Sequence, residues 1–206
     1  QRRNYSQVAK QLLTDTSIFE SFHKLRRDSG VGKNNWEWFR QAINQNTKMA
    51  EMNQIRDQIA SDPTRGRSRL FLGQMYFFFY NQPEYRTTLP FYDTFPLVLL
   101  ISREKDTFFG INFHYIPPKR RLKMFMLLQK YRQNNRIILP YGRMKSNNQW
   151  KIFKSCFRRY KVQKVQGKLI NIPAEDWPIA INLPVERFKK QGKTAIWENT
   201  LREEMS

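Results

Sequence analysis

The sequence contains very few of the side chains that most often bind metals or carry out covalent chemistry. Among its 206 residues there is one cysteine, Cys156, and there are two histidines, His23 and His114. One cysteine cannot form a disulfide within the chain, and these three residues cannot complete the four-ligand site of a structural zinc ion. Cys156 lies between Phe153 and Phe157 in an apolar pattern, so we interpret it as a packing residue. We therefore expect no metal, no cofactor and a reducing compartment of synthesis.

Long apolar runs and known catalytic motifs are missing as well. The longest apolar run, Phe95 to Ile101, has seven residues, whereas a membrane-spanning helix needs about 20. The sequence has no P-loop and none of the GxGxxG, GxSxG or HExxH patterns that hold nucleotides, activated serines or zinc. We therefore expect neither a membrane protein nor an enzyme that acts on a small-molecule substrate.

The most informative absence is that of acidic residues between Thr107 and Ala174. These 68 residues contain no Asp or Glu, but they hold 16 of the 37 Lys and Arg residues. Outside this acid-free segment, 21 basic residues stand against 17 acidic ones, so most of the formal net charge of +20 comes from one third of the chain. Such a concentration of positive charge favours an anionic partner.

Helical spacing dominates the first 62 residues. The pair Ser17 and Glu20 has the spacing of a capping box, and apolar residues follow at helical intervals. Either Asn34 or Asn35 can cap a second helix, and a third apolar stripe ends at Pro63. The three arginines that follow point to one face of an extended chain: Arg65, Arg67 and Arg69. They fit a solvated linker and a phosphate contact equally well.

The pattern then changes to that of β-strands. Aromatic and β-branched runs cover Leu70 to Tyr80, Phe95 to Ile101 and Thr107 to Tyr115. The last two are joined by the polar residues Arg103 to Asp106, which predicts a hairpin. Strands of this kind form either a small antiparallel sheet or an SH3-like β-barrel, and the sequence alone leaves both open. The nearly neutral charge of this part indicates the core of the fold.

The acid-free segment predicts helices that pack on these strands. Pro117 and Pro118 open one helix, since proline is tolerated at the first helical positions. A second helix is expected over 150–161, with Lys151, Lys154, Arg158 and Lys161 on one face and apolar residues on the other. An extended stretch should cover 162–172, and short helices 184–190 and 194–204. We therefore predict an α+β fold with a helical N-terminal arm, 1–69, and a second unit, 70–206.

Nucleic acid is the anionic partner that this charge distribution favours most. Lys and Arg side chains that neutralise DNA phosphates release counterions, and this release supplies most of the affinity that is independent of sequence. We take the basic positions of the predicted helices and of the strand that follows as the candidate DNA-binding residues: Lys119, Arg120, Arg121, Lys123, Lys151, Lys154, Arg158, Arg159, Lys161, Lys164 and Lys168.

Two other functions remain open at this point. A structural subunit of a larger assembly would use the same basic surface to bind acidic neighbours. A metal-dependent nuclease would need two or three carboxylates and a lysine, for which Asp93, Glu104, Lys105 and Asp106 are the candidates. Their spacing fits no nuclease motif, and residues 104–106 are better interpreted as a hairpin turn. A membrane surface is a poor partner, because the apolar face of the basic helix is needed for the core.

Four blocks of sequence are distinctive: Gly73–Tyr80 (GQMYFFFY), Leu89–Leu97 (LPFYDTFPL), Phe109–Pro118 (FGINFHYIPP) and Asn182–Phe188 (NLPVERF). Together they resemble the DNA end protector family, virion proteins of T-even-type tailed phages. The similarity covers roughly residues 70–188 and does not include the helical first third. The blocks carry few charges, so we interpret Pro90, Tyr92, Asp93, Phe95 and Gly110 as fold-forming positions.

The resemblance implies a non-enzymatic protein that is made in the host cytoplasm and carried in the virion. Its partners would be the double-stranded ends of the linear genome and other virion subunits, and it would shield the ends from host exonuclease. The alternatives then become a tail, baseplate or neck component and, less favoured, a nuclease. The family supplies no binding residues to transfer, so the candidate positions rest on charge and helix geometry.

Overall fold

The computed structural model describes residues 17–47, 52–140, 142 and 151–205. The α-helices are α2 (Ile18–Asp28), α3 (Trp36–Asn46), α4 (Met52–Ser61), α5 (Tyr85–Thr88), α6 (Pro118–Leu128), α8 (Lys151–Lys154), α9 (Trp177–Ala180) and α10 (Lys193–Met205). The strands are β1 (Gly66–Arg67), β2 (Met75–Tyr80), β3 (Tyr92–Asp93), β4 (Leu97–Arg103), β5 (Thr107–Asn112), β6 (Arg132–Gln133), β7 (Arg136–Ile137), β8 (Phe157–Lys161), β9 (Val165–Ile172) and β10 (Phe188–Lys189). Short 3₁₀ helices are η2 (Phe113–Tyr115), η3 (Gln129–Tyr131), η5 (Val162–Lys164) and η6 (Ala174–Asp176). The predicted α+β class is confirmed.

The early helices form where the apolar spacing predicts them. Asn35 caps α3, because its side-chain oxygen accepts a hydrogen bond from the backbone N–H of Trp38 at 3.1 Å. Ser17 occupies the N-cap position of α2, but its side chain makes no capping hydrogen bond, so the predicted capping box does not form. The third helix, α4, ends just before Asp62 and Pro63, as expected.

One six-stranded antiparallel sheet organises the rest of the chain, in the order β1-β9-β2-β4-β5-β8. The predicted hairpin is confirmed: β4 pairs with β5, and the backbone N–H of Glu104 closes the turn on the carbonyl of Thr107 at 2.8 Å. Gly110 lies opposite Leu100, and a Cβ atom at Gly110 would collide with Val98 and with the carbonyl oxygen of Leu99. The interpretation of Gly110 as a fold-forming position is therefore confirmed.

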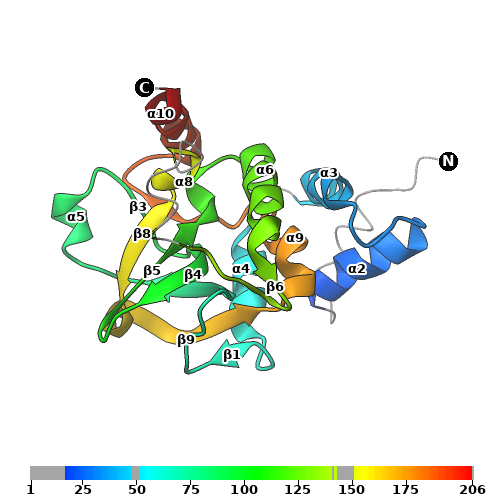
Figure 1. Cartoon of the computed structure of the whole chain (residues 1–206), viewed down its shortest axis with the longest axis horizontal. Helices are drawn as coiled ribbons and strands as arrows, with labels where there is room; N and C mark the ends of the chain where they lie inside the picture. Colours follow the sequence, from blue (N-terminus) through cyan, green and yellow to red (C-terminus); the bar gives the residue numbers. More distant parts are fainter. Residues whose placement is uncertain (1–16, 48–51, 141, 143–150, 206) are drawn as a thin grey trace.

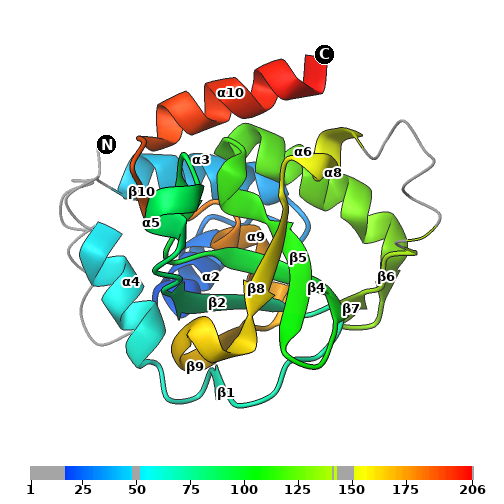
Figure 2. The same ribbon diagram turned by 90° about the vertical axis from the view of Figure 1, so that its left-hand side faces the viewer.

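The sheet curls strongly but stays open. The backbone N–H of Lys161, on the edge strand β8, donates to the hydroxyl of Tyr80 on β2 at 3.0 Å, although β4 and β5 lie between these strands. Inside the curl the rings of Tyr80 and Tyr160 meet edge to face at 5.0 Å, with Phe78 and Phe108 beside them. In the described ranges β1 and β8 are the two edges of the sheet, so of the two predicted alternatives the chain forms the small antiparallel sheet and not the closed barrel. Figure 2 shows this sheet from its β8 side.

The helices cover the other face of the sheet and share one core with it. Figure 1 shows α2, α3, α6 and α9 gathered on one side of the strands. The apolar core includes Phe22 of α2 and Phe39 of α3 together with Phe77 of β2, so the first helices are packed into the same core as the sheet. The rings of Trp36 and Phe125 meet edge to face at 5.2 Å, which places the start of α3 against α6.

A single carboxylate also fixes the early part of the chain to the later part. Asp176 accepts a hydrogen bond from His23 of α2 at 2.8 Å and another from Arg65 at 2.8 Å. Arg65 reaches Asp62 as well, at 2.9 Å, and its guanidinium lies 4.2 Å from the centre of the Phe19 ring. Arg65 is therefore a structural residue, whereas Arg67 and Arg69 are exposed.

The predicted helix over 150–161 is wrong for most of its length. Only α8 is helical, and residues 157–161 form strand β8, which pairs with β5. Trp150 lies outside the described residues. On the side of β5 that faces away from β4, the backbone N–H and C=O groups need hydrogen-bond partners. Pairing with these groups stabilises a strand at 157–161 more than the helical spacing of Phe153, Phe157 and Tyr160 stabilises a helix. The next stretch is extended as expected, in β9, after the short η5 turn.

The last two helix predictions have different outcomes. The segment 184–190 is not helical: Phe188 and Lys189 form β10, which pairs with β3. The final helix is confirmed as α10, and the indole N–H of Trp197 attaches it to the carbonyl of His114 at 2.8 Å. Figures 1 and 2 both show α10 at the same end of the molecule as the start of α6.

Candidate nucleic-acid interface

The candidate cations on α6 do not share one environment. Lys119 and Lys123 are exposed, and Arg120 is half-buried. Arg121 is completely buried: its guanidinium donates to the carboxylate of Glu186 and to two backbone carbonyls, at 2.7 and 3.2 Å. Inclusion of Arg121 among the surface cations is therefore wrong, because its position in the helix faces the core.

Strand geometry determines which cations of β8 are exposed and which point inward. Successive side chains of a strand point to opposite faces, so Arg159 and Lys161 are exposed while Tyr160 between them is buried. Arg158 turns inward, and its guanidinium lies 3.7 Å from the centre of the Tyr115 ring. The four-residue cationic helix face predicted here does not exist, because these residues belong to a short helix and a strand. The side chain of Lys151 lies outside the described residues.

The remaining candidates lie on α8 and η5, which flank β8 in the chain, and on β9. Lys154 of α8 is exposed, Lys164 of η5 is half-buried, and Lys168 of β9 is exposed. β9 is the neighbour of the edge strand β1, whereas β8 is the opposite edge of the sheet. The candidate cations are therefore distributed over several elements of the fold: α6, α8, β8, η5 and β9.

Acidic residues from elsewhere in the chain approach several of these cations. Glu104 lies 3.5 Å from Arg159. The pKa of Glu84 is lowered by a hydrogen bond with its own backbone and by the charges of Lys164 and Lys161. The pKa of Glu37 is lowered mainly by a hydrogen bond from Arg40, and the charge of Lys119 adds to the effect. The segment is acid-free in sequence, but its surface is partly neutralised in space.

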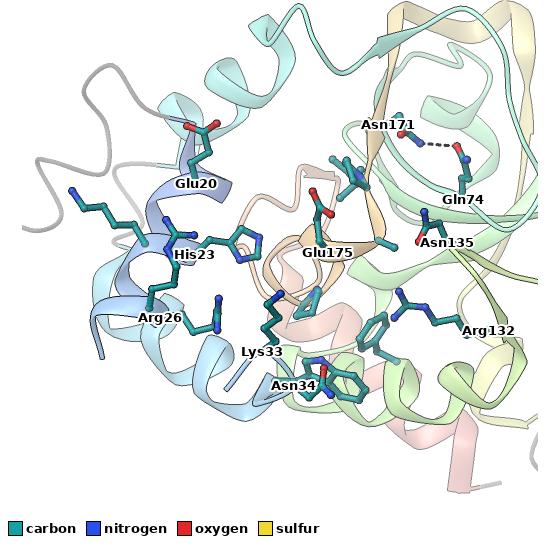
Figure 3. A pocket seen from close by; sticks show the side chains of 18 residues that line it. Glu20, His23, Arg26, Lys33, Asn34, Gln74, Arg132, Asn135, Asn171 and Glu175 are labelled. Carbon is teal, nitrogen blue, oxygen red and sulfur yellow. Dashed lines mark hydrogen bonds between the residues drawn. The ribbon is translucent and has the colours of Figure 1, made fainter. Parts of the chain in front are cut away.

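A different part of the molecule combines positive charge with a concave shape. A groove of about 900 Å³ opens between α2 and the loop after it, the end of α6 with the β6–β7 hairpin, and the residues after β9 (Figure 3). Five cations line it: Lys24, Arg26, Arg27, Lys33 and Arg132. Two acids line it as well, Glu20 and Glu175, so the groove has a formal excess of three positive charges.

Several of the lining side chains are held in place by hydrogen bonds. Arg26 is buried and donates to the carbonyl of Val31 at 2.9 Å, which fixes the loop after α2. Arg132 donates to the carbonyl of Asn134 at 2.8 Å within the β6–β7 hairpin. Figure 3 shows the charged end of Arg132 directed into the groove from one side and that of Lys33 on the opposite side. The two walls thus present positive charge to the same space.

Neutral polar groups and the aromatic side chains of Trp36 and Phe125 also line the groove. Four side-chain amides face the groove: Asn34, Gln74, Asn135 and Asn171. The Asn171 amide donates to Gln74 at 2.9 Å, as the dashed line in Figure 3 indicates. Trp36 lines the groove beside Phe125 and is only partly buried. The groove therefore offers cations, amides and an indole, which are the groups that bind phosphates and bases.

None of the ten candidate positions whose side chains the structure describes lines this groove. Its cations come mainly from α2 and the following loop, where Glu20 and Asp28 offset part of the positive charge along the sequence. Arg132 belongs to the acid-free segment but lies outside the two helices on which the prediction was based. The available signal was the run Lys24, Arg26 and Arg27 followed by Lys33, yet the opposite wall is contributed by residues about 100 positions away.

The carboxylates considered for a nuclease are placed differently from one another. Asp93 is buried and accepts hydrogen bonds from the Asn112 amide at 3.2 Å and from the backbone N–H of Phe95 at 3.0 Å, and it lies 2.7 Å from His114. Glu104 and Asp106 are exposed in the β4–β5 turn, which confirms the interpretation of this stretch as a turn. Within the described ranges, no three His, Cys, Asp or Glu residues are grouped as metal ligands would be.

Comparison with known proteins gives a match over almost the whole chain. A family model with the description "Phage T4 terminal DNA protecting protein" matches residues 1–202. No curated protein and no solved structure matches the chain. None of the helices in the described ranges is long and apolar enough to span a membrane.

Proposed function

This chain belongs to the family of phage T4 terminal DNA protecting proteins, and on that premise we propose that it binds the ends of linear double-stranded DNA and shields them from exonucleases. The family match, which spans residues 1–202, carries the proposal and agrees with the resemblance of the four sequence blocks. We further propose that the protein travels with the genome in the virion and contacts other virion subunits there.

Charge supports a DNA ligand. The chain has a formal net charge of +20, and exposed cations occur on α6, α8, β8 and β9 as well as around the groove. Proteins that neutralise several phosphates gain affinity from counterion release without reading sequence, and a protector of genome ends has to bind whatever sequence the end carries. The cations outside the groove would bind the phosphates of the duplex, whereas the groove is suited to DNA that is not in a regular duplex.

Protection of this kind needs no catalysis. A bound protein covers the terminal bond that an exonuclease must reach, so occupancy alone lowers the rate of degradation. Asp93, which a nuclease mechanism would have to use, is buried among Asn112, His114 and Phe95, and hydrogen bonds already occupy its oxygens. We therefore propose a binding protein and assign no catalytic residue.

The direct test is survival of linear DNA. Blunt linear duplex is incubated with the protein and then treated separately with a 5′→3′ and a 3′→5′ exonuclease, and the remaining full-length DNA is measured over time. We expect the protein to slow both enzymes, and we expect linear DNA to compete for it better than circular DNA of the same sequence. Equal degradation with and without the protein would refute the proposal.

The same experiment separates the alternatives. A structural subunit whose basic surface binds acidic proteins would bind linear and circular DNA alike and give no protection. A nuclease would itself shorten linear DNA when Mg²⁺ is added, and Asp93→Asn would abolish that activity. Neither result is compatible with end protection by binding.

A further inference from the structure

We propose that the groove between α2, the β6–β7 hairpin and η6 holds the unpaired terminal nucleotides of one DNA strand. This inference rests on the proposed function, and it names the part of the DNA end that the protein recognises. It assigns to the groove a ligand of stated chemistry, single-stranded DNA at a terminus, and it assigns the duplex next to that terminus to the cations outside the groove.

The volume of the groove favours a single strand. About 900 Å³ lies in the upper part of the range of ~300–1,000 Å³ that is typical of pockets for small organic ligands. A B-form duplex, whose major groove alone is about 12 Å wide, is too large to enter a cavity of this size. A few nucleotides of one strand are comparable to such ligands and can enter it.

The positions of the cations fit a strand that passes between two walls. Arg27 and Lys33 belong to one wall and Arg132 to the other, and Figure 3 shows Lys33 and Arg132 reaching into the same space. A single strand carries a phosphate at every nucleotide, so cations on both sides can neutralise successive phosphates. Glu20 and Glu175 offset part of the charge, and the remaining excess is still positive.

The neutral lining fits exposed bases. In a duplex the Watson–Crick edges are paired, whereas unpaired bases present donors and acceptors that side-chain amides can bind. Asn34 and Asn135 lie on different walls of the groove, and Gln74 and Asn171 form a hydrogen-bonded pair that still lines it. Trp36, packed edge to face on Phe125, offers an aromatic surface for stacking, which tolerates any base.

A groove of this kind explains how an end is distinguished from the interior of a duplex. Only at an end can the last base pairs open without forming a bubble, and each step that opens loses its stacking energy. Binding energy from phosphates and from stacking on Trp36 offsets that cost. A covalently closed end cannot release a free strand, so the groove would discriminate against it.

The test compares three duplexes of equal length: one with a short single-stranded tail, one with a blunt end and one closed by hairpins at both ends. We expect the intact protein to bind the tailed duplex most tightly and the closed duplex most weakly. The combined substitution of Lys33→Gln and Arg132→Gln should lower the affinity for the tailed duplex about tenfold. It should also make the slope of log K against log salt for that duplex shallower by about 2, and the affinity for the closed duplex should hardly change.

A matched control carries the same change in charge outside the groove. Lys123 and Lys154 are both exposed and do not line it, so Lys123→Gln with Lys154→Gln should weaken binding of all three duplexes by the same factor and keep their order. Thermal unfolding of both double variants establishes that they remain folded. A groove variant that keeps the preference for open ends would overturn the inference while the proposed function stands.

A second variant tests stacking independently of charge. Trp36→Leu keeps an apolar side chain against Phe125 but removes the indole, and we expect a loss of fivefold or more in binding of the tailed duplex only. If the intact protein binds all three duplexes equally, end binding itself fails. If it prefers open ends but Trp36→Leu and the groove variant both bind like the intact protein, the groove is not the site.

Discussion

The guanidinium of Arg121 donates a hydrogen bond to the carboxylate of Glu186 inside the protein, and the two residues lie 65 positions apart in the chain. Arg121 comes from the acid-free segment and Glu186 from the more acidic part that follows it. Lys193 approaches the second oxygen of Glu186 at 3.5 Å. Because two buried charges are stable only as a pair, loss of either one leaves the other without compensation.

This pair makes stability depend on pH. Burial opposes ionisation of Glu186, but the charge of Arg121, with those of His114 and Lys193, outweighs it and lowers the pKa of Glu186 from 4.5 to about 2. A carboxyl with a lowered folded-state pKa stabilises the fold fully above its unfolded value, and that contribution disappears as the pH falls toward 2. We expect a loss of about 3 kcal/mol over this interval in the intact protein.

Glu186→Gln should remove this pH-dependent contribution and lower the free energy of unfolding at neutral pH by about 3–5 kcal/mol. Urea unfolding at neutral pH and at several acidic pH values measures both effects. Glu104→Gln is the control, because Glu104 and Arg159 are 59% and 60% exposed, and such pairs contribute about 1 kcal/mol or less. Equal effects of the two substitutions would contradict the buried pair.

Neighbouring arginines on β8 should respond differently to the same substitution. Arg158 lies over the Tyr115 ring at 3.7 Å, so Arg158→Gln should destabilise the protein by about 2 kcal/mol. Arg159 is exposed, so Arg159→Gln should leave the unfolding free energy nearly unchanged and weaken DNA binding, with the salt slope reduced by about 1. Thermal unfolding and titration of DNA at several salt concentrations measure the two effects, and a reversed assignment would contradict the inward position of Arg158.

Gly110 should not tolerate a methyl group. Gly110→Ala forces a Cβ atom against Val98 and the carbonyl oxygen of Leu99, and backbone cannot move aside as a flexible side chain would. We expect a loss of about 1–3 kcal/mol or more in the unfolding free energy. Gly192→Ala is the matched control, since a Cβ atom there meets nothing within 4 Å, and its effect should stay within about 0.5 kcal/mol.

Salt should weaken DNA binding in a measurable proportion. If the protein neutralises about six phosphates, the logarithm of the association constant should fall against the logarithm of salt concentration with a slope of about −5. Fluorescence anisotropy with a labelled duplex at several salt concentrations gives this slope. A flat dependence would mean that the distributed cations do not contact phosphates.

Local signals in the sequence were sufficient for much of the fold. Pro118 begins α6 because proline fits the first helical positions, and Asn35 caps α3 through its side chain. Arg103 and Thr107 bound the turn of the β4–β5 hairpin, as the polar residues between them indicate. In each case the decisive interactions lie within a few residues of the chain.

Non-local pairing decided the elements that were predicted wrongly. Phe157 and Tyr160 have a spacing that fits a helix, yet β8 forms because β5 offers it an edge. Phe188 likewise joins Asp93, which is far away in sequence. The local sequence pattern does not predict whether a segment will pair with a strand that is distant in the chain.

The burial of Arg121 did have a signal in the sequence. Met124, Phe125 and Leu128 follow it at intervals of three, four and seven residues, and all three are buried on the face of α6 that turns inward. The groove had no such signal, because Lys33 and Arg132 are 99 positions apart in the sequence and line the same groove only in the folded chain. Charge along the chain could indicate an anionic partner but not the place where it binds.

The walls of the groove come mainly from three stretches, around residues 20–36, 125–135 and 171–178, and Gln74 adds a fourth part of the chain. In the unfolded chain these stretches separate and the cavity does not exist. A ligand that binds only the assembled cavity raises the free energy of unfolding by an amount set by its concentration relative to its dissociation constant. If the groove holds the DNA terminus, as we propose, protection is mutual: the terminus that the protein shields also stabilises the packing of these distant segments against unfolding.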